Sequence, residues 1–207
     1  MSPLTYAKDI RLVLVTASTQ EPLPRSEVKA WLKVPEDDVA DDAVIDRLLA
    51  TARRRIEAYT KRAFMIQTFD AYLTEAPCAA IELPRSPLVG VTSIKGFTDT
   101  DATDSGGTAM SSSQYYLDVA SEPGQVVPFS GFTFPVGTRI ANPAIVRFTA
   151  GYTSSSAATA VPAEAKLAIT TYVAYLYEHR GDELGASDQL PADVVACLGD
   201  LVLPEWG

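Results

Sequence analysis

The chain has 207 residues, of which 47% are hydrophobic and 21% charged, and its formal net charge is −9. This length suits one good core, or a compact domain with a substantial insertion. A diffuse negative charge is repelled by phosphate backbones, which disfavours tight nucleic-acid binding through the overall charge of the protein. The sequence has no run of about 18 apolar residues, so it predicts no membrane-spanning helix.

Neither the N-terminus nor the cysteines point to secretion. The apolar run at residues 10–15 is short, contains Arg11 and lacks a basic flank, which argues against a signal peptide. Cys78 and Cys197 lie far apart in sequence, so they predict two reduced thiols in a cytoplasmic protein rather than a disulfide framework or a metal site.

Two helices are predicted in the first third of the chain. The first carries Val28, Trp31 and Leu32 at helical spacing and ends before Pro35. The second begins at Asp41, where a carboxylate favours the positive end of the helix dipole. Its apolar residues recur at three- and four-residue steps and form the clearest amphipathic stripe of the sequence: Ile45, Leu48, Leu49, Ala52, Ile56 and Tyr59.

The middle of the chain changes to short β-like runs separated by Pro, Gly, Ser and Asp. Residues 65–74 are rich in aromatic and β-branched side chains, and residues 115–119 and 144–150 alternate with a period of two. A polar loop rich in glycine and serine covers residues 99–113. This pattern predicts an antiparallel sheet or a small barrel.

Two further helices are predicted near the C-terminus. Pro162 stands at a helix start, where its missing N–H costs nothing, and an apolar stripe runs from Ala165 to Leu176. A short last helix is predicted to begin near Pro191, and the tail from Leu203 onward cannot continue it.

The order of helices, strands and helices predicts an α+β fold, with a helical bundle core from both chain ends and an inserted antiparallel β-sheet or small barrel. Helices of this length need one another to bury their apolar stripes. The predicted parts are an N-terminal segment (1–23), the helical core (24–63 and 161–201), the β insertion (64–153) and a C-terminal tail (202–207).

The sequence carries little sign of catalytic chemistry. His179 is its one histidine, and no G-x-S-x-G elbow is present. Asp99, Asp101 and Asp104 resemble part of a calcium loop, but an EF-hand needs Gly and Glu at the positions that Asp104 and Met110 occupy. We therefore predict that the protein is not an enzyme and has no cofactor or metal site. The less favoured alternative is a metal-dependent hydrolase that uses these aspartates.

One basic cluster is a candidate contact surface, and it consists of Arg53, Arg54, Arg55, Lys61 and Arg62. On a helix these residues point in several directions, because each step turns by about 100°. They either form a solvated face with partners such as Glu57, or contact an acidic neighbouring subunit or DNA.

The C-terminal segment is a second candidate, because Leu201, Val202, Leu203 and Trp206 lie beyond the last helix. An exposed Trp in a tail is a plausible docking anchor, since it carries a large apolar area. In the alternative interpretation, the segment folds back on its own helices.

Three stretches of the chain occur in a distinctive order and spacing. They are residues 27–32 followed by 41–64, residues 83–89 running into 91–94, and residues 146–152 followed by Val161, Pro162 and the helix to Gly181. Together they span most of residues 24–181, and they resemble the head–tail connector (adaptor) family of long-tailed bacteriophages and gene transfer agents.

This resemblance implies a virion protein at the head–tail interface, assembled in the bacterial cytoplasm. It implies a homo-oligomeric ring, expected to be twelve-fold, that lies beneath the portal protein, extends the DNA channel and docks the stopper or tail-completion protein, with a monomer in isolation as an alternative. DNA would pass through an acidic lumen without specific binding, and no membrane is involved. Another neck or tail-completion role is the alternative function.

The resemblance also implies which part of the chain engages the portal protein. In such adaptors this is the C-terminal segment, which assigns portal docking to Leu201, Val202, Leu203, Pro204 and Trp206.

Overall fold

The structure is a computed structural model that describes residues 10–74, 80–135, 137–152, 161–180 and 189–203. The chain divides into two compact units. The β unit comprises Met1–Ser18, Ile66–Gly151 and Glu205–Gly207, and the helical unit comprises Thr19–Met65 and Tyr152–Pro204. Within the described residues, no helix has both the length and the apolar character that a membrane span requires.

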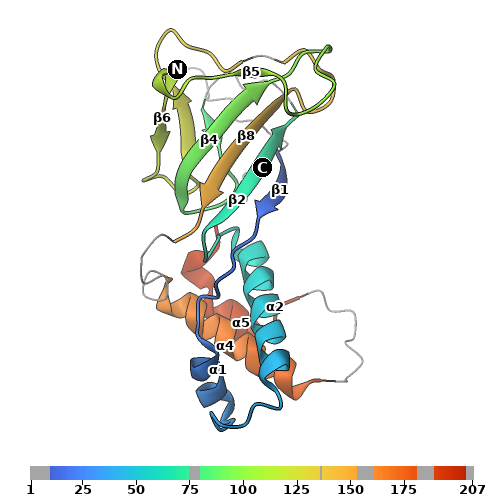
Figure 1. The fold of residues 1–207 in the computed structure, drawn as a ribbon. Helices are drawn as coiled ribbons and strands as arrows, with labels where there is room; N and C mark the ends of the chain where they lie inside the picture. The colour runs from blue at the N-terminus through green and yellow to red at the C-terminus, as the bar shows by residue number, and fades with distance from the viewer. Residues whose placement is uncertain (1–9, 75–79, 136, 153–160, 181–188, 204–207) are drawn as a thin grey trace. The chain divides into compact units, whose positions relative to one another are not determined.

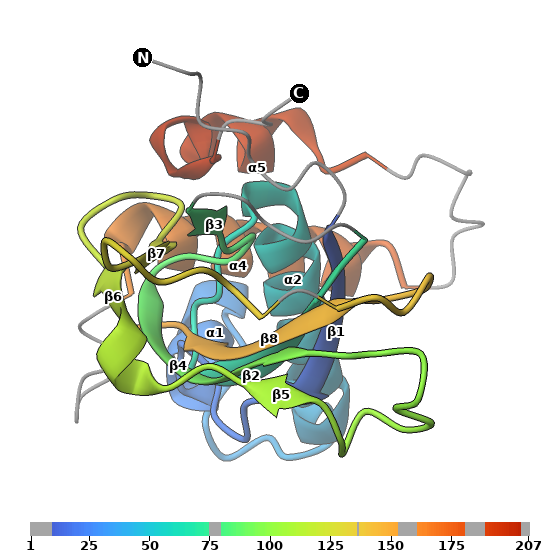
Figure 2. The ribbon, with the colours of Figure 1, turned by 90° about the horizontal axis from the view of Figure 1, so that it is seen from above.

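The β unit contains two antiparallel sheets (Figures 1 and 2). The five-stranded sheet has the order β1 (Ile10–Thr16), β2 (Gln67–Leu73), β8 (Ala144–Ala150), β4 (Leu88–Gly96) and β5 (Thr108–Ala109). The three-stranded sheet has the order β3 (Ile81–Glu82), β7 (Gln125–Pro128) and β6 (Tyr115–Asp118), and the short helix η1 (Ser112–Gln114) leads into β6. Among the described residues no ladder joins the two sheets into a closed barrel.

The core of the β unit follows from alternation along its central strands. Phe69 on β2 lies directly opposite Phe148 on β8, and their ring centroids are 5.6 Å apart. Val146 and Phe148 are completely buried, as are Ile81 and Val126 of the smaller sheet. Because successive strand residues point to opposite faces, the intervening Arg147 reaches the other face of the sheet and forms an ion pair with Asp70.

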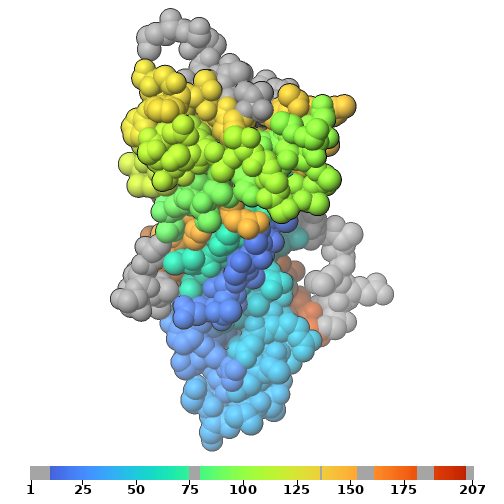
Figure 3. Space-filling view, turned by 45° about the horizontal axis from the view of Figure 1, so that its top comes forward, coloured from blue at the N-terminus to red at the C-terminus, as the bar shows by residue number. Residues whose placement is uncertain are grey.

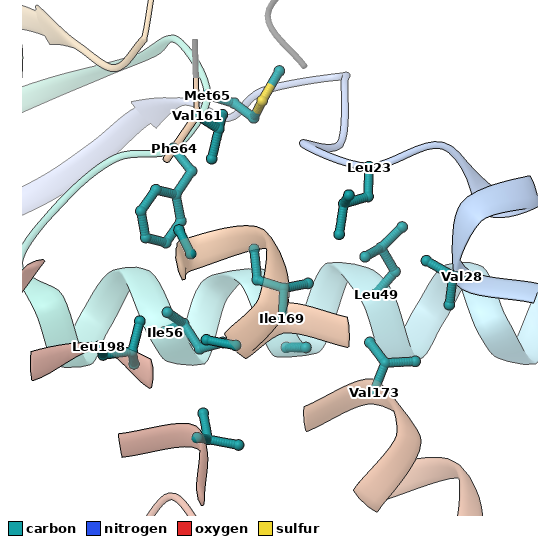
Figure 4. Close-up of a cluster of buried hydrophobic side chains, with 14 of the residues drawn as sticks. Leu23, Val28, Leu49, Ile56, Phe64, Met65, Val161, Ile169, Val173 and Leu198 are labelled. Atoms are coloured by element: carbon teal, nitrogen blue, oxygen red, sulfur yellow. The ribbon is translucent and has the colours of Figure 1, made fainter. Parts of the chain in front are cut away.

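The helical unit consists of α1 (Arg25–Leu32), α2 (Asp42–Thr60), α4 (Ala163–Glu178), α5 (Ala192–Cys197) and the short helix η2 (Gly199–Leu201). The α2 stripe predicted from the sequence is its centre, since Ile45, Leu49 and Ile56 are buried. These side chains meet Ile169 and Val173 of α4 in one apolar cluster, which also includes Phe64 and Leu198 (Figure 4). Helices α2 and α4 therefore bury most of their stripes against each other, as helices of this length must, whereas Trp31 of α1 and Tyr59 of α2 are exposed.

The predicted α+β class is confirmed, and so are the antiparallel sheets. The sequence pattern, however, predicts no strand within residues 1–23, whereas β1 pairs with β2 from Ile10 opposite Leu73 to Leu14 opposite Phe69. Its apolar run is a strand added at the edge of the large sheet. The free cysteine Cys197 is half-buried in the helical unit, and Cys78 lies outside the described residues.

Candidate functional site

The two groups of candidate residues meet where helix α2 ends. The backbone N–H of Leu203 donates to the carbonyl of Thr60 at 3.2 Å, and Nε of Arg62 donates to the carbonyl of Leu201 at 2.8 Å. We call this arrangement the tail junction and define it as Thr60, Lys61, Arg62, Leu201, Val202 and Leu203. The sequence separates these two groups by about 140 positions, and the fold brings them together.

The tail junction forms because a helix end leaves carbonyl groups without intrahelical partners. Lys61 takes the left-handed conformation, with φ of 60°, and so ends α2. The Thr60 hydroxyl donates back to the carbonyl of Ile56 at 2.8 Å and accepts from the N–H of Arg62 at 3.3 Å. The chain beyond α5 then supplies the N–H that the Thr60 carbonyl lacks.

Only part of the tail junction is open to a partner. Leu203 and Arg62 are buried, and Leu201 packs against the helical core. Lys61 and Val202 are exposed, with Tyr59 exposed on the preceding turn. The described part of the C-terminal segment therefore folds back on its own helices and leaves Val202 outward, while Pro204 and Trp206 lie outside the described residues.

Arg53 is separated from the rest of the basic cluster by burial. Its side chain is only 3% exposed, and its guanidinium lies 2.7 Å from Glu21 and 3.0 Å from Glu57. Burial would lower the pKa of Arg53, but the hydrogen bonds that it donates to Glu21 and the negative charge of Glu57 outweigh this effect and hold that pKa above its ordinary value. Arg54 is exposed and Arg55 half-buried, so the five cations do not form a single patch.

Glu57 links this buried pair to the chain after α2. One carboxylate oxygen receives the Arg53 guanidinium, and the other accepts the backbone N–H of Phe64 at 2.9 Å. Phe64 in turn stacks on Tyr152, with centroids 6.5 Å apart. Arg53 is therefore engaged inside the helical unit, where it holds Glu57 and, through Glu57, the backbone at Phe64.

Lys29 is a positioning residue that the sequence patterns do not single out. Its ammonium group is buried, lies 2.7 Å from Oδ1 of Asp42, and donates to the carbonyls of Glu36 and Asp38 at 3.1 and 2.7 Å. These contacts fix the turn between α1 and α2. The available signal was the dense run of acidic residues over positions 36–42, which calls for a cation nearby.

The end of α4 is held at the start of α2 by Asp41. Its carboxylate accepts from the hydroxyl of Tyr177 and from Nη1 of Arg180, the latter at 3.2 Å. The hydrogen bond from Tyr177, followed by that from Arg180, lowers the pKa of Asp41. His179 stacks on Tyr175 at 4.3 Å and has its Nδ1 2.7 Å from the carbonyl of Tyr175, so its contacts belong to the helix end.

The acidic loop that suggested metal binding is held by its own hydrogen bonds. Asp101 accepts from the backbone and hydroxyl of Thr98 at 2.6 and 3.0 Å, and these bonds lower its pKa. Asp104 forms an ion pair with Arg139 at 3.0 Å. The two carboxylates thus face different partners, and in the described part of the chain no set of His, Cys, Asp or Glu gathers as metal ligands would.

Comparison with known proteins gives a fold likeness over almost the whole chain. No family model matches the sequence, and no curated protein matches it significantly. Three similar solved chains come from the neck of an empty gene transfer agent particle computed with C6 symmetry, from the virion of a native gene transfer agent particle, and from the neck of a native particle computed with C12 symmetry.

Each of these chains is 24% identical to this one and covers 95% of it, and their TM-scores are 0.73, 0.73 and 0.68. The alignments include 98%, 97% and 98% of those chains, respectively. At this identity, the likeness establishes a shared fold that includes both the helical and the β elements.

Proposed function

We propose that this chain is a structural, non-enzymatic neck protein of a phage-like particle, and that it acts there as the head–tail connector beneath the portal protein. The observation that carries the proposal is the fold likeness over 95% of the chain to chains of gene transfer agent necks. The carboxylates of the acidic loop have contacts within the chain, since Asp101 accepts hydrogen bonds from Thr98 and Asp104 pairs with Arg139.

The connector would work as a ring of identical subunits, which we expect to be twelve-fold. The neck chains of similar fold come from assemblies computed with C6 and C12 symmetry. A cyclic ring joins two different surfaces of each subunit, and modest contacts become strong when they are repeated around it. With a net charge of −9 per subunit, such a ring would let DNA slide through without adhering to the wall.

The portal protein would dock at the tail junction and along the segment that leaves it. Val202 is exposed there, whereas hydrogen bonds hold the residues on either side of it, Leu201 and Leu203, to the end of α2. The described part of the proposed docking segment, residues 201–203, is thus already fixed to α2, which reduces the ordering cost of docking. Lys61 and Arg54 are the exposed cations of the basic cluster, and we assign to them the contact with an acidic neighbouring subunit.

Reconstitution with the portal protein and the tail-side proteins of the same particle tests the function. The expected result in electron micrographs is a ring of this chain between the portal and the tail-side protein. Binding to the tail-side protein alone would replace the connector role with that of another neck or tail-completion protein. Failure to join either component would overturn the proposal.

A pair of variants tests the docking residues. Val202→Asp places a charge on the proposed docking segment, and we expect the affinity for the portal to fall about tenfold or more, because an unpaired charge is costly to bury in an interface. Val39→Asp is the matched control, since Val39 is exposed in the helical unit away from the tail junction. Deleting residues 204–207 should weaken the same complex. Equal portal binding by all variants would contradict the assignment.

A further inference from the structure

Strand β1 leaves an apolar edge on the large sheet. It is the outermost strand, with β2 as its ladder partner, and no described residue pairs with its other side. Val13, Leu14 and Val15 are 39%, 48% and 44% exposed. In Figure 3 the deep-blue atoms of the first described residues lie at the surface of the face in view.

Consecutive exposure has a specific meaning in a strand. Successive side chains point to opposite faces of the sheet, so exposure of three neighbours means that both faces are uncovered at this end of β1. Ile66, which is also exposed, precedes β2 at the same end, because Thr16 pairs with Thr68. We define the β1 edge as the outer side of β1 together with Val13, Leu14, Val15 and Ile66.

The opposite side of the same sheet is partly covered. There β5 pairs with Lys95 and Gly96 of β4, and the N–H of Met110 donates to the carbonyl of Ile94. Covering segments are a usual means by which proteins prevent unwanted strand pairing, and an uncovered apolar edge is a hazard for a protein that works alone. Strand β1 shifts register against β2 between Leu14 and Thr16, but no described segment covers its outer side. This difference in cover indicates that β1 is available for pairing.

Charge indicates what covers the β1 edge. Each copy of the chain carries −9, so two copies repel each other across most of their surfaces. Residues 10–20 contain no acidic residue and one arginine, which makes this edge a place where copies approach at low electrostatic cost. A cyclic ring joins each subunit to the next through two different surfaces. The β1 edge of one copy would therefore contact a different surface of the neighbouring copy.

We propose that the β1 edge is the surface by which one copy of this chain packs against the next copy in the ring. The neighbouring copy pairs with the free backbone groups of β1 and buries the four apolar side chains. Strand addition of this kind obtains affinity from main-chain hydrogen bonds and apolar pockets together. This inference rests on the proposed ring and adds the contact that joins its subunits.

Site-specific photo-crosslinking in the assembled ring tests the contact directly. A benzophenone amino acid at position 13 should give covalent dimers and higher multimers of this chain. The same probe at position 89 is the matched control, since Val89 is 41% exposed on strand β4, which lies three strands away from β1 in the same sheet. Crosslinks from position 13 to the portal or tail-side protein alone, or equal multimer yields from both positions, would overturn the inference.

Charge variants provide the second test. Val13→Lys with Val15→Lys should reduce incorporation into the ring at least tenfold, while Val89→Lys is incorporated like the unchanged chain. All three residues are exposed, so melting temperatures close to that of the unchanged chain are expected and show that folding is intact. If the unchanged chain forms rings and the double variant joins them equally well, only the β1 contact fails. If the unchanged chain forms no ring even when it is mixed with the portal protein, the proposed function fails as well.

Discussion

The helical unit and the β unit handle buried charge differently. Among the described residues, the helical unit buries Lys29, Arg53, Glu57 and Arg62, whereas Asp70 is the buried charged residue of the β unit. Each of the four in the helical unit contacts a carboxylate, a guanidinium or a backbone carbonyl. In the β unit, the partner of Asp70 is the exposed Arg147, and Asp104 and Arg139 pair at the surface.

This difference shows two ways of fixing a chain. Strands are fixed by their ladders and by apolar pairs across them, so the ion pairs of the β unit need not be fully buried, and a pair that is partly exposed contributes little. The helical unit joins two segments that are far apart in sequence through turns and helix ends. There, buried charges hold backbone groups that no ladder satisfies, and removing one partner leaves a costly unpaired charge.

The largest effect is expected from the apolar core of the β unit. Phe148→Ala removes a buried ring stacked on Phe69 and should lower the free energy of unfolding by about 4 kcal/mol, through lost burial and the cavity that remains. Phe132→Ala is the control, because Phe132 is exposed. Urea unfolding measures both variants, and equal losses of stability would contradict the assigned core.

The buried charges of the helical unit come next. Glu57→Ala leaves the N–H of Phe64 and part of the Arg53 guanidinium unpaired, and we expect a loss of about 3 kcal/mol in the free energy of unfolding. Asp104→Ala breaks an ion pair at the surface of the β unit and should cost less than about 0.5 kcal/mol. If the two substitutions cost the same in urea unfolding, the contrast between the units is wrong.

The smallest expected effect is the change with pH in the stability that Asp41 contributes. Because its partners Tyr177 and Arg180 lower the pKa of Asp41, the charged carboxylate stabilises the folded protein above the unfolded pKa of about 4, and this contribution is lost as the pH falls through the lower folded pKa. Asp41→Asn should therefore be less stable than the unchanged chain at pH 7, and the gap should close in acid.

Urea midpoints measured between neutral and strongly acidic pH follow this gap. Asp99→Asn is the control, since Asp99 lies exposed in the loop after β4, and it should track the unchanged chain throughout. A gap between Asp41→Asn and the unchanged chain that does not vary with pH would rule out the link between Asp41 and the end of α4.

The sequence predicts the helices better than their contacts. The stripe from Ile45 to Ile56 is a local pattern, and it reappears as the buried face of α2. The basic cluster is equally visible in the sequence, but whether each cation is exposed depends on what packs above it. Arg53 is covered by Glu21, which lies 32 positions earlier, while its neighbour Arg54 is open to solvent. No local pattern distinguishes these two arginines.

By itself, the sequence determined the α+β class, the helical stripes, the alternating strands and the lack of a catalytic motif, because each of these depends on neighbours within a few positions. Only the tertiary structure decided that residues 10–16 form an edge strand, since their partner Gln67–Leu73 follows more than 50 positions later. It also decided that Leu203 is bonded to the end of α2. Both are hydrogen bonds between backbone groups that lie far apart in the sequence. Almost every residue carries the same backbone N–H and C=O groups, so the partners are decided by which of these groups the rest of the fold leaves unpaired.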